Sequence, residues 1–105
     1  MIVSHIKKKI YLTEAEAIDL YKEVDYILVS LNNIAHYYYN ESKINEEKRR
    51  AYERETTNFI DDNDITTLLS KMRGMIGGKF DREPGEDDMD DLERATENNK
   101  YWEGP

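Results

Sequence analysis

The sequence predicts an all-α protein, in which a long N-terminal helix packs with two or three shorter helices as a helical hairpin or bundle. Apolar residues recur at alternating spacings of three and four across residues 17–38, which is the period of a helix with one apolar face. Hydrophobic residues make up 38% of the chain and charged residues 36%, so the core must be small and built from helix stripes. We divide the 105 residues into a helical domain, residues 1–80, and an acidic C-terminal segment, residues 81–105.

A short N-terminal extended strand is expected before the first helix. Residues 2–12 alternate, with Ile2, Ile6 and Ile10 on one face of the strand and Lys7 and Lys9 on the other. A single strand needs a partner. Edge pairing in a dimer and an unpaired arm are both compatible with the pattern.

The long helix begins after Thr13. The run from Thr13 to Glu16 is a capping box, in which the Thr13 hydroxyl accepts from the backbone N–H of Glu16 and the Glu16 carboxylate reaches back. The apolar stripe that follows consists of Ala17, Leu20, Val24, Ile27, Leu31, Ile34 and Tyr38, widened by Tyr21, Leu28 and Ala35. We expect this helix to run from Glu14 to Asn40, which suits a hairpin, a bundle or the seam of a homodimer.

Two shorter helices are expected after a polar turn at residues 40–43. The second helix should run from Ile44 to Phe59, with a sparse apolar face and a charged outer face. The run Asp61–Asp64 ends it and supplies N-caps for a third helix. The apolar stripe of that third helix is Ile65, Leu68, Leu69, Met72, Met75 and Ile76. Gly77 and Gly78 then predict a left-handed stop.

The C-terminal segment predicts an acidic helix or tail, with a weak helix that starts near Pro84. Proline is favoured in the first turn of a helix, and acids there are stabilised by the helix dipole. Met89 and Leu92, one turn apart, are its strongest apolar contacts. Tyr101 and Trp102 are expected to anchor the end of the chain.

The negative charge is concentrated in this segment. Residues 1–80 carry 13 acids and 12 bases, whereas residues 81–105 carry 10 acids and 3 bases, so −7 of the net charge of −8 lies there. Such a segment repels nucleic acids and anionic membranes and attracts basic protein surfaces. We expect no membrane span and no secretory signal. With no cysteine in the chain, a cytoplasmic location is expected.

Two groups of residues are candidates for binding a partner protein. The first group is acidic with a small apolar pair, and consists of Glu83, Glu86, Asp87, Asp88, Met89, Asp90, Asp91, Leu92 and Glu93. The second group is Tyr37, Tyr38 and Tyr39, which project over nearly the whole circumference of the long helix, so at least one faces outward. Exposed tyrosine is enriched at interaction hot spots. A solubility tail and ordinary packing are the respective alternatives.

No residue pattern predicts catalysis, a cofactor or a metal site. The run Asp61–Asp64 fails as a calcium loop because the ligand, glycine and glutamate positions that should follow are not filled. The two histidines, His5 and His36, have no second ligand at a metal-binding spacing. A helix-turn-helix is disfavoured because the expected recognition helix carries only Lys71 and Arg73 as bases.

The sequence therefore predicts a non-enzymatic inhibitor or modulator that engages a basic, nucleic-acid-binding protein through an acidic face. In size, charge and composition it is similar to small acidic phage-encoded proteins that block host nucleic-acid-handling proteins, including DNA mimics and CRISPR inhibitors. The alternatives are a helical dimeric adaptor or transcriptional regulator with the long helix as its seam, and a small metal-dependent nucleotide hydrolase. The hydrolase is disfavoured because paired acids on facing helices are missing.

Overall fold

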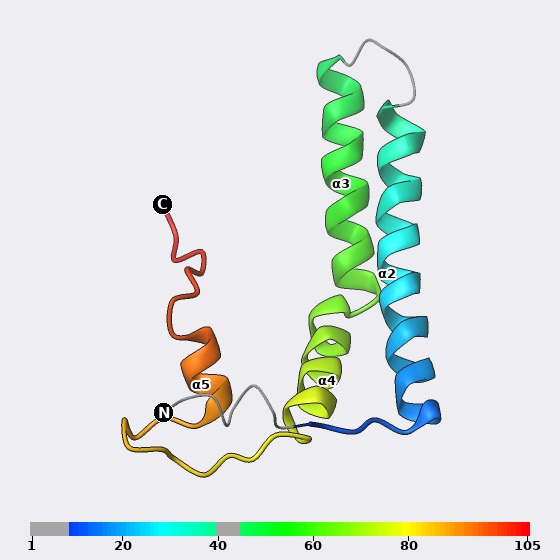
Figure 1. Ribbon diagram of the computed structural model, residues 1–105. Helices are drawn as coiled ribbons and strands as arrows, with labels where there is room; N and C mark the ends of the chain where they lie inside the picture. The colour runs from blue at the N-terminus through cyan, green and yellow to red at the C-terminus, as the bar shows by residue number, and fades with distance from the viewer. Residues whose placement is uncertain (1–8, 40–44) are drawn as a thin grey trace. The chain divides into compact units, whose positions relative to one another are not determined.

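The computed structural model describes residues 9–39 and 45–105 (Figure 1). Four helices follow one another: α2 (Glu14–Tyr39), α3 (Glu46–Asp62), α4 (Ile65–Gly77) and α5 (Asp91–Thr96). The described residues contain no strand, so the predicted all-α class with a long N-terminal helix is confirmed. Most of the strand expected over residues 2–12, and the turn at residues 40–43, lie outside the described residues. Residues 9–13, which are described, form no strand.

The chain divides into two compact units. The helical unit is Leu12–Arg73. The second unit groups the described residues 9–11 with Gly74–Pro105, and we call it the C-terminal unit. The boundary lies within α4, seven residues before the expected boundary between residues 80 and 81.

The start of α2 has the geometry that the capping box predicts. The Thr13 backbone N–H donates to Glu16 Oε1 over 2.9 Å, and the Glu16 backbone N–H donates to Thr13 Oγ1 over 3.1 Å. Two N–H groups that the first helical turn would otherwise leave without partners are therefore satisfied. The helix runs to Tyr39, and the expected last residue, Asn40, lies outside the described residues.

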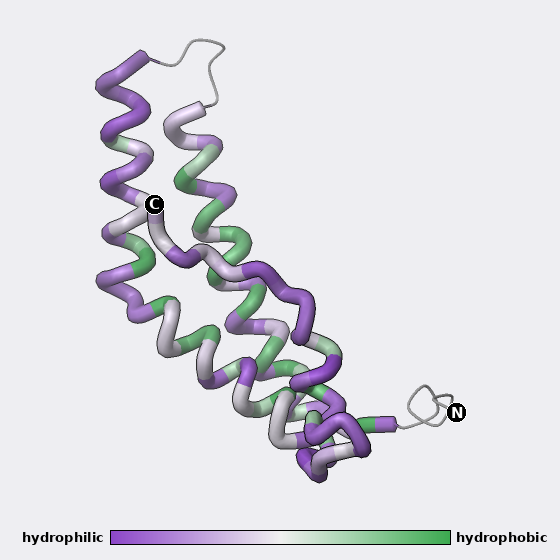
Figure 2. The backbone as a smooth tube through the Cα atoms, turned by 90° about the vertical axis from the view of Figure 1, so that its left-hand side faces the viewer, coloured by the Kyte–Doolittle hydropathy of each residue, from purple (hydrophilic) through white to green (hydrophobic). Residues whose placement is uncertain are grey.

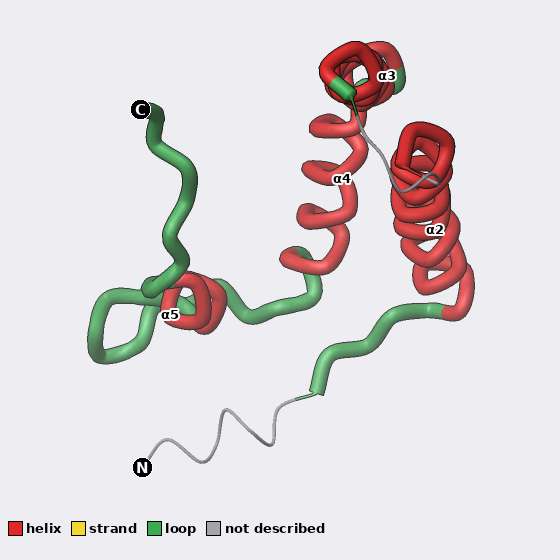
Figure 3. The backbone as a smooth tube through the Cα atoms, turned by 90° about the horizontal axis from the view of Figure 1, so that it is seen from above, coloured by secondary structure: helices red, strands yellow, loops and turns green. Residues whose placement is uncertain are grey.

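In the helical unit, α2 and α3 lie side by side and run in opposite directions (Figures 1 and 3). Aromatic rings join them along their length. Tyr26 and Phe59 have ring centroids 5.7 Å apart, and Tyr39 meets Tyr52 edge-on at 4.7 Å. The Tyr26 hydroxyl also donates to Asn63 Oδ1 over 3.0 Å. These contacts stabilise the antiparallel pair although α3 is hydrophilic along most of its length (Figure 2).

The helix α3 starts and ends later than its sequence predicts. Asn45 is its N-cap and accepts from the Lys48 backbone N–H over 2.7 Å. Its last turn includes Asp61 and Asp62, which the sequence placed in the break. The break is confined to two residues, and Asp64 turns the chain with a left-handed φ of 52°, a conformation that aspartate tolerates better than most residues.

The buried apolar core of the described residues is small. Only Ile65 and Met72, two turns apart on one face of α4, are buried, and α2 has no buried residue. The stripe predicted on α2 divides into two. Its side with Leu20, Ile27 and Ile34 is half-buried, whereas most of its other side is exposed.

Two predictions for the chain after α4 are wrong. The helix α4 does not end in a left-handed glycine, because neither Gly77 nor Gly78 has a positive φ. The Gly78 and Lys79 backbone N–H groups instead donate to carbonyls of the last turn, over 2.9 and 3.0 Å. No helix starts near Pro84; α5 begins at Asp91.

Candidate partner-binding surface

A tight loop, residues 85–89, replaces the expected start of the acidic helix. The Gly85 backbone N–H donates to the Met89 carbonyl over 2.8 Å, and the Asp88 backbone N–H donates to the Gly85 carbonyl over 3.1 Å. Asp88 has a left-handed φ of 61°, so a helix cannot run through it. Met89 therefore precedes α5, and the predicted i,i+3 pairing of Met89 with Leu92 on a helix face does not form.

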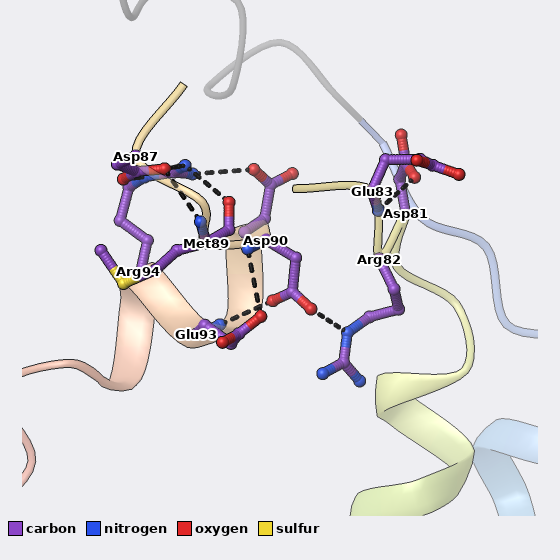
Figure 4. A network of polar contacts seen from close by, with 9 residues as sticks. Asp81, Arg82, Glu83, Asp87, Met89, Asp90, Glu93 and Arg94 are labelled. Atoms are coloured by element: carbon purple, nitrogen blue, oxygen red, sulfur yellow. Dashed lines mark hydrogen bonds and ion pairs between the residues drawn. The ribbon is translucent and has the colours of Figure 1, made fainter. Parts of the chain in front are cut away.

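Arg94 of α5 holds this loop (Figure 4). Its guanidinium donates to both carboxylate oxygens of Asp87, from Nε over 2.9 Å and from Nη2 over 2.7 Å. It also donates to Asp91 Oδ1 over 3.1 Å and to the Met89 carbonyl over 3.0 Å. Hydrogen bonds from Arg94 hold the pKa of Asp87 at about 2, below its ordinary value of 3.8. Gly85 leaves room for this arrangement, since a Cβ there would lie 2.8 Å from Arg94 Nη2.

Asp90 caps α5 and is withdrawn from the surface. Its carboxylate accepts from the Glu93 backbone N–H over 2.8 Å, and the Glu93 carboxylate accepts from the Asp90 backbone N–H over 3.3 Å, completing a capping box. Arg82 Nε donates to the other Asp90 oxygen. The Glu93 N–H and then the Arg82 guanidinium lower the pKa of Asp90. With 3% of its surface exposed, Asp90 stabilises the C-terminal unit and cannot reach a partner.

The structure thus sorts the nine acidic-segment candidates by role. Asp87, Asp90 and Asp91 form ion pairs inside the unit. Leu92 packs toward the end of α4, with its Cδ1 3.7 Å from where a Cβ on Gly77 would stand, and Met89 is half-buried. Asp87 is exposed as well as paired, and the exposed acidic candidates that these ion pairs do not use are Glu83, Glu86, Asp88 and Glu93.

The ion pairs of Arg82 and Arg94 leave most of the acids of residues 81–105 exposed and without an arginine partner in the same unit. Both arginines of residues 81–105 are held by acids of the same unit. The acids that these ion pairs do not use are exposed, and they are Asp81, Glu83, Glu86, Asp88, Glu93, Glu97 and Glu103. The C-terminal unit therefore presents mainly carboxylates to its surroundings.

Two aromatic residues that the sequence assigned to anchoring are exposed instead. Trp102 has 86% of its surface exposed and Tyr101 has 68%, so the prediction that they anchor the chain end is wrong. Their sequence neighbours include Glu97 and Glu103. A tryptophan beside a tyrosine in a segment rich in acids is the signal that could have marked them as binding residues.

The tyrosine candidates lie at the end of α2 in the helical unit. Tyr37 is 74% exposed and contacts Tyr38 edge-on at 4.9 Å, while Tyr38 and Tyr39 both lie against Tyr52. A groove of about 520 Å³ runs beside them between α2 and α3, lined by Asn33, Ile34, Tyr37, Tyr38, Glu55, Asn58, Phe59, Asp62 and Asn63. Its lining contains two carboxylates and no cationic side chain, so it favours a cation over an anion.

Other kinds of site are not found in the part of the chain that the structure describes. Residues 9–39 and 45–105 contain no group of three or more His, Cys, Asp or Glu side chains arranged to hold a metal ion. Within the same ranges, no helix combines the length and apolarity needed to cross a bilayer. Comparisons with protein-family models, with curated proteins and with solved structures find no match. The function must therefore be argued from the geometry of the chain itself.

Proposed function

We propose that the protein is a non-enzymatic binding protein that engages a basic, nucleic-acid-binding partner through its C-terminal unit. The observation that carries the proposal is the combination of seven exposed carboxylates with the exposed Trp102 in one small unit. A solubility tail needs the charge but has no use for an exposed tryptophan, because apolar surface lowers solubility.

Charge and aromatic surface contribute to different steps of binding. The exposed acids speed the encounter with a basic surface, and this effect weakens as salt screens the charges. Trp102 buries its ring in the partner and so slows dissociation, as tryptophan hot spots do. The ion pairs of Arg82 and Arg94 fix the loop that carries Glu86 and Asp88, so that less conformational freedom is lost on binding.

The biological class that fits these features is an inhibitor. An array of carboxylates on a folded unit is a substitute for the phosphates that a nucleic-acid-binding protein contacts. A phage-encoded protein of this kind would act in the host cell by occupying such a surface, as DNA mimics and CRISPR inhibitors do. The groove beside Tyr37 provides a second place where a basic side chain of the partner fits, since cations bind favourably over tyrosine rings.

Two triple variants of equal net charge test the proposal. In the test variant, Glu83→Gln, Glu86→Gln and Asp88→Asn remove acids of the C-terminal unit; asparagine suits the left-handed backbone at residue 88. In the control variant, Glu47→Gln, Glu53→Gln and Asp61→Asn remove three exposed acids of α3. Each variant and the unchanged protein are immobilised and used to capture proteins from the source cell or its host.

The expected result is a basic protein captured by the unchanged protein and by the control, released by duplex DNA, and depleted with the test variant. Trp102→Ala should shorten the residence time of that protein at least tenfold, and Trp102→Phe should restore most of it. Equal capture by the test and control variants would show that only total charge matters. If duplex DNA does not release the captured protein, the proposal that the partner binds nucleic acids is contradicted.

A further inference from the structure

The open side of α2 has no partner among the described residues of the helical unit. It consists of a seam at spacings of four and three, formed by Ala17, Tyr21, Val24, Leu28, Leu31 and Ala35. Its first four members are exposed, with Tyr21 at 71%, Leu28 at 55% and Val24 at 46%, and the last two are half-buried. This seam lies beside the half-buried stripe of Leu20, Ile27 and Ile34, so α2 presents two adjoining apolar faces of which α3 and α4 cover one.

The periodicity of the seam points to another helix as its occupant. Apolar residues repeated every 3.5 positions are the pattern that lets two helices pack side chains into each other along their whole length. Including the polar side chains at its edges, the seam offers an interface on the order of 1,000 Å² over two copies, about the lower size of a specific interface. An apolar strip of this size on a monomer marks an interaction site.

The charges along α2 select the orientation of a second copy. Residues 14–25 carry five acids and one base. Residues 26–39 contain no Asp, Glu, Lys or Arg, so a parallel pair would place two acidic halves together. An antiparallel pair places each acidic half beside the uncharged half of the other copy and opposes the two helix dipoles.

We infer that the protein forms an antiparallel homodimer through this seam. The symmetry axis passes near residue 26, because that register stacks Val24 on the partner's Leu28, Tyr21 on the partner's Leu31, and Ala17 on the partner's Ala35. Small side chains then meet at the ends and large ones at the centre. The inference goes beyond the proposed function and does not depend on it, since the seam lies in the helical unit, whereas the carboxylates and Trp102 that carry the proposed function lie in the C-terminal unit.

Disulfide formation tests the pairing, because the chain contains no cysteine of its own. The double variant Ala17→Cys with Ala35→Cys should form a covalent dimer under mild oxidation. The two positions are about 27 Å apart along one helix, too far for a bridge within a chain. Each single variant should stay uncrosslinked in the antiparallel register. The control is the double variant Ile18→Cys with His36→Cys. It keeps the 18-residue spacing but moves both thiols one residue around the helix, away from the seam, so it should crosslink less.

The oligomeric state provides the second measurement. Light scattering should give about twice the mass of one chain, which is 12.4 kDa. The variant Leu28→Glu should have the mass of a single chain, with unchanged helix content. Ile18→Glu, at a similarly exposed position (48%) on another side of α2, should remain dimeric. A monomer at all concentrations up to about 0.5 mM, or equal crosslinking of the control pair, would overturn the inference. Crosslinking of the single variants would overturn the antiparallel orientation.

Discussion

Replacement of Ile65 by alanine should be among the most destabilising single changes in the helical unit. Ile65 is 4% exposed, and the change removes three carbon atoms. At about 0.8 kcal/mol for each buried methylene, the transfer term is about 2.4 kcal/mol, and the cavity left behind raises it to about 3 kcal/mol. A unit of this size has a total stability of only about 3–9 kcal/mol, so the variant would lose a large share of its fold.

The control is Leu69→Ala on the same helix. Leu69 is 47% exposed, so the same loss of three carbons should cost only about 1 kcal/mol. Urea unfolding followed by circular dichroism at 222 nm measures both variants, with the slope of the transition checked for constancy. If Ile65→Ala costs no more than Leu69→Ala, or less than about 0.5 kcal/mol, then α4 does not form the core of the helical unit.

Three further predictions concern the caps, the ion pairs and nucleic acids. Thr13→Ala should lower the free energy of unfolding by about 1 kcal/mol through loss of the N-cap; an unchanged urea midpoint would show that the cap does not form. The Asp87 carboxyl should titrate near pH 2 in a carbon NMR experiment, because Arg94 hydrogen bonds lower its pKa from 3.8. The stabilisation from the Asp87–Arg94 ion pair is then fully present above pH 3.8 and is lost as the pH falls through 2. A titration midpoint of Asp87 at pH 3.8 or above would contradict this ion pair. Duplex DNA should not shift in a gel at low salt, where electrostatic affinity is largest, because the net charge is −8; sub-micromolar binding that resists competitor DNA would refute this.

The helices of the helical unit could be predicted because their signals are local. The capping box at Thr13 and the apolar repeat of α2 lie within a few residues of the bonds and contacts they describe. The division of that repeat into a covered and an open side could not be predicted in the same way. It depends on which side α3 and α4 occupy, and Val24 belongs to both apolar faces by its spacing.

The C-terminal unit was harder to predict because side chains there determine the backbone. Spacing alone places Asp87, Asp90 and Asp91 together on one acidic surface. The structure assigns all three to Arg82 and Arg94, and this pairing depends on a loop whose left-handed residue is not a glycine. The exposure of Trp102 could not be predicted for a related reason, since the sequence does not show whether a tryptophan ring packs inside its own unit or faces solvent.

Binding kinetics with the captured protein decide whether the C-terminal unit binds a basic partner by charge and by Trp102. The association rate should fall steeply as salt rises from 50 to 300 mM for the unchanged protein and for the α3 control variant. It should be slower and less salt-dependent for the Glu83, Glu86 and Asp88 variant, while Trp102→Ala should change mainly the dissociation rate. Association and dissociation rates that are the same for all four proteins at every salt concentration would contradict the claim.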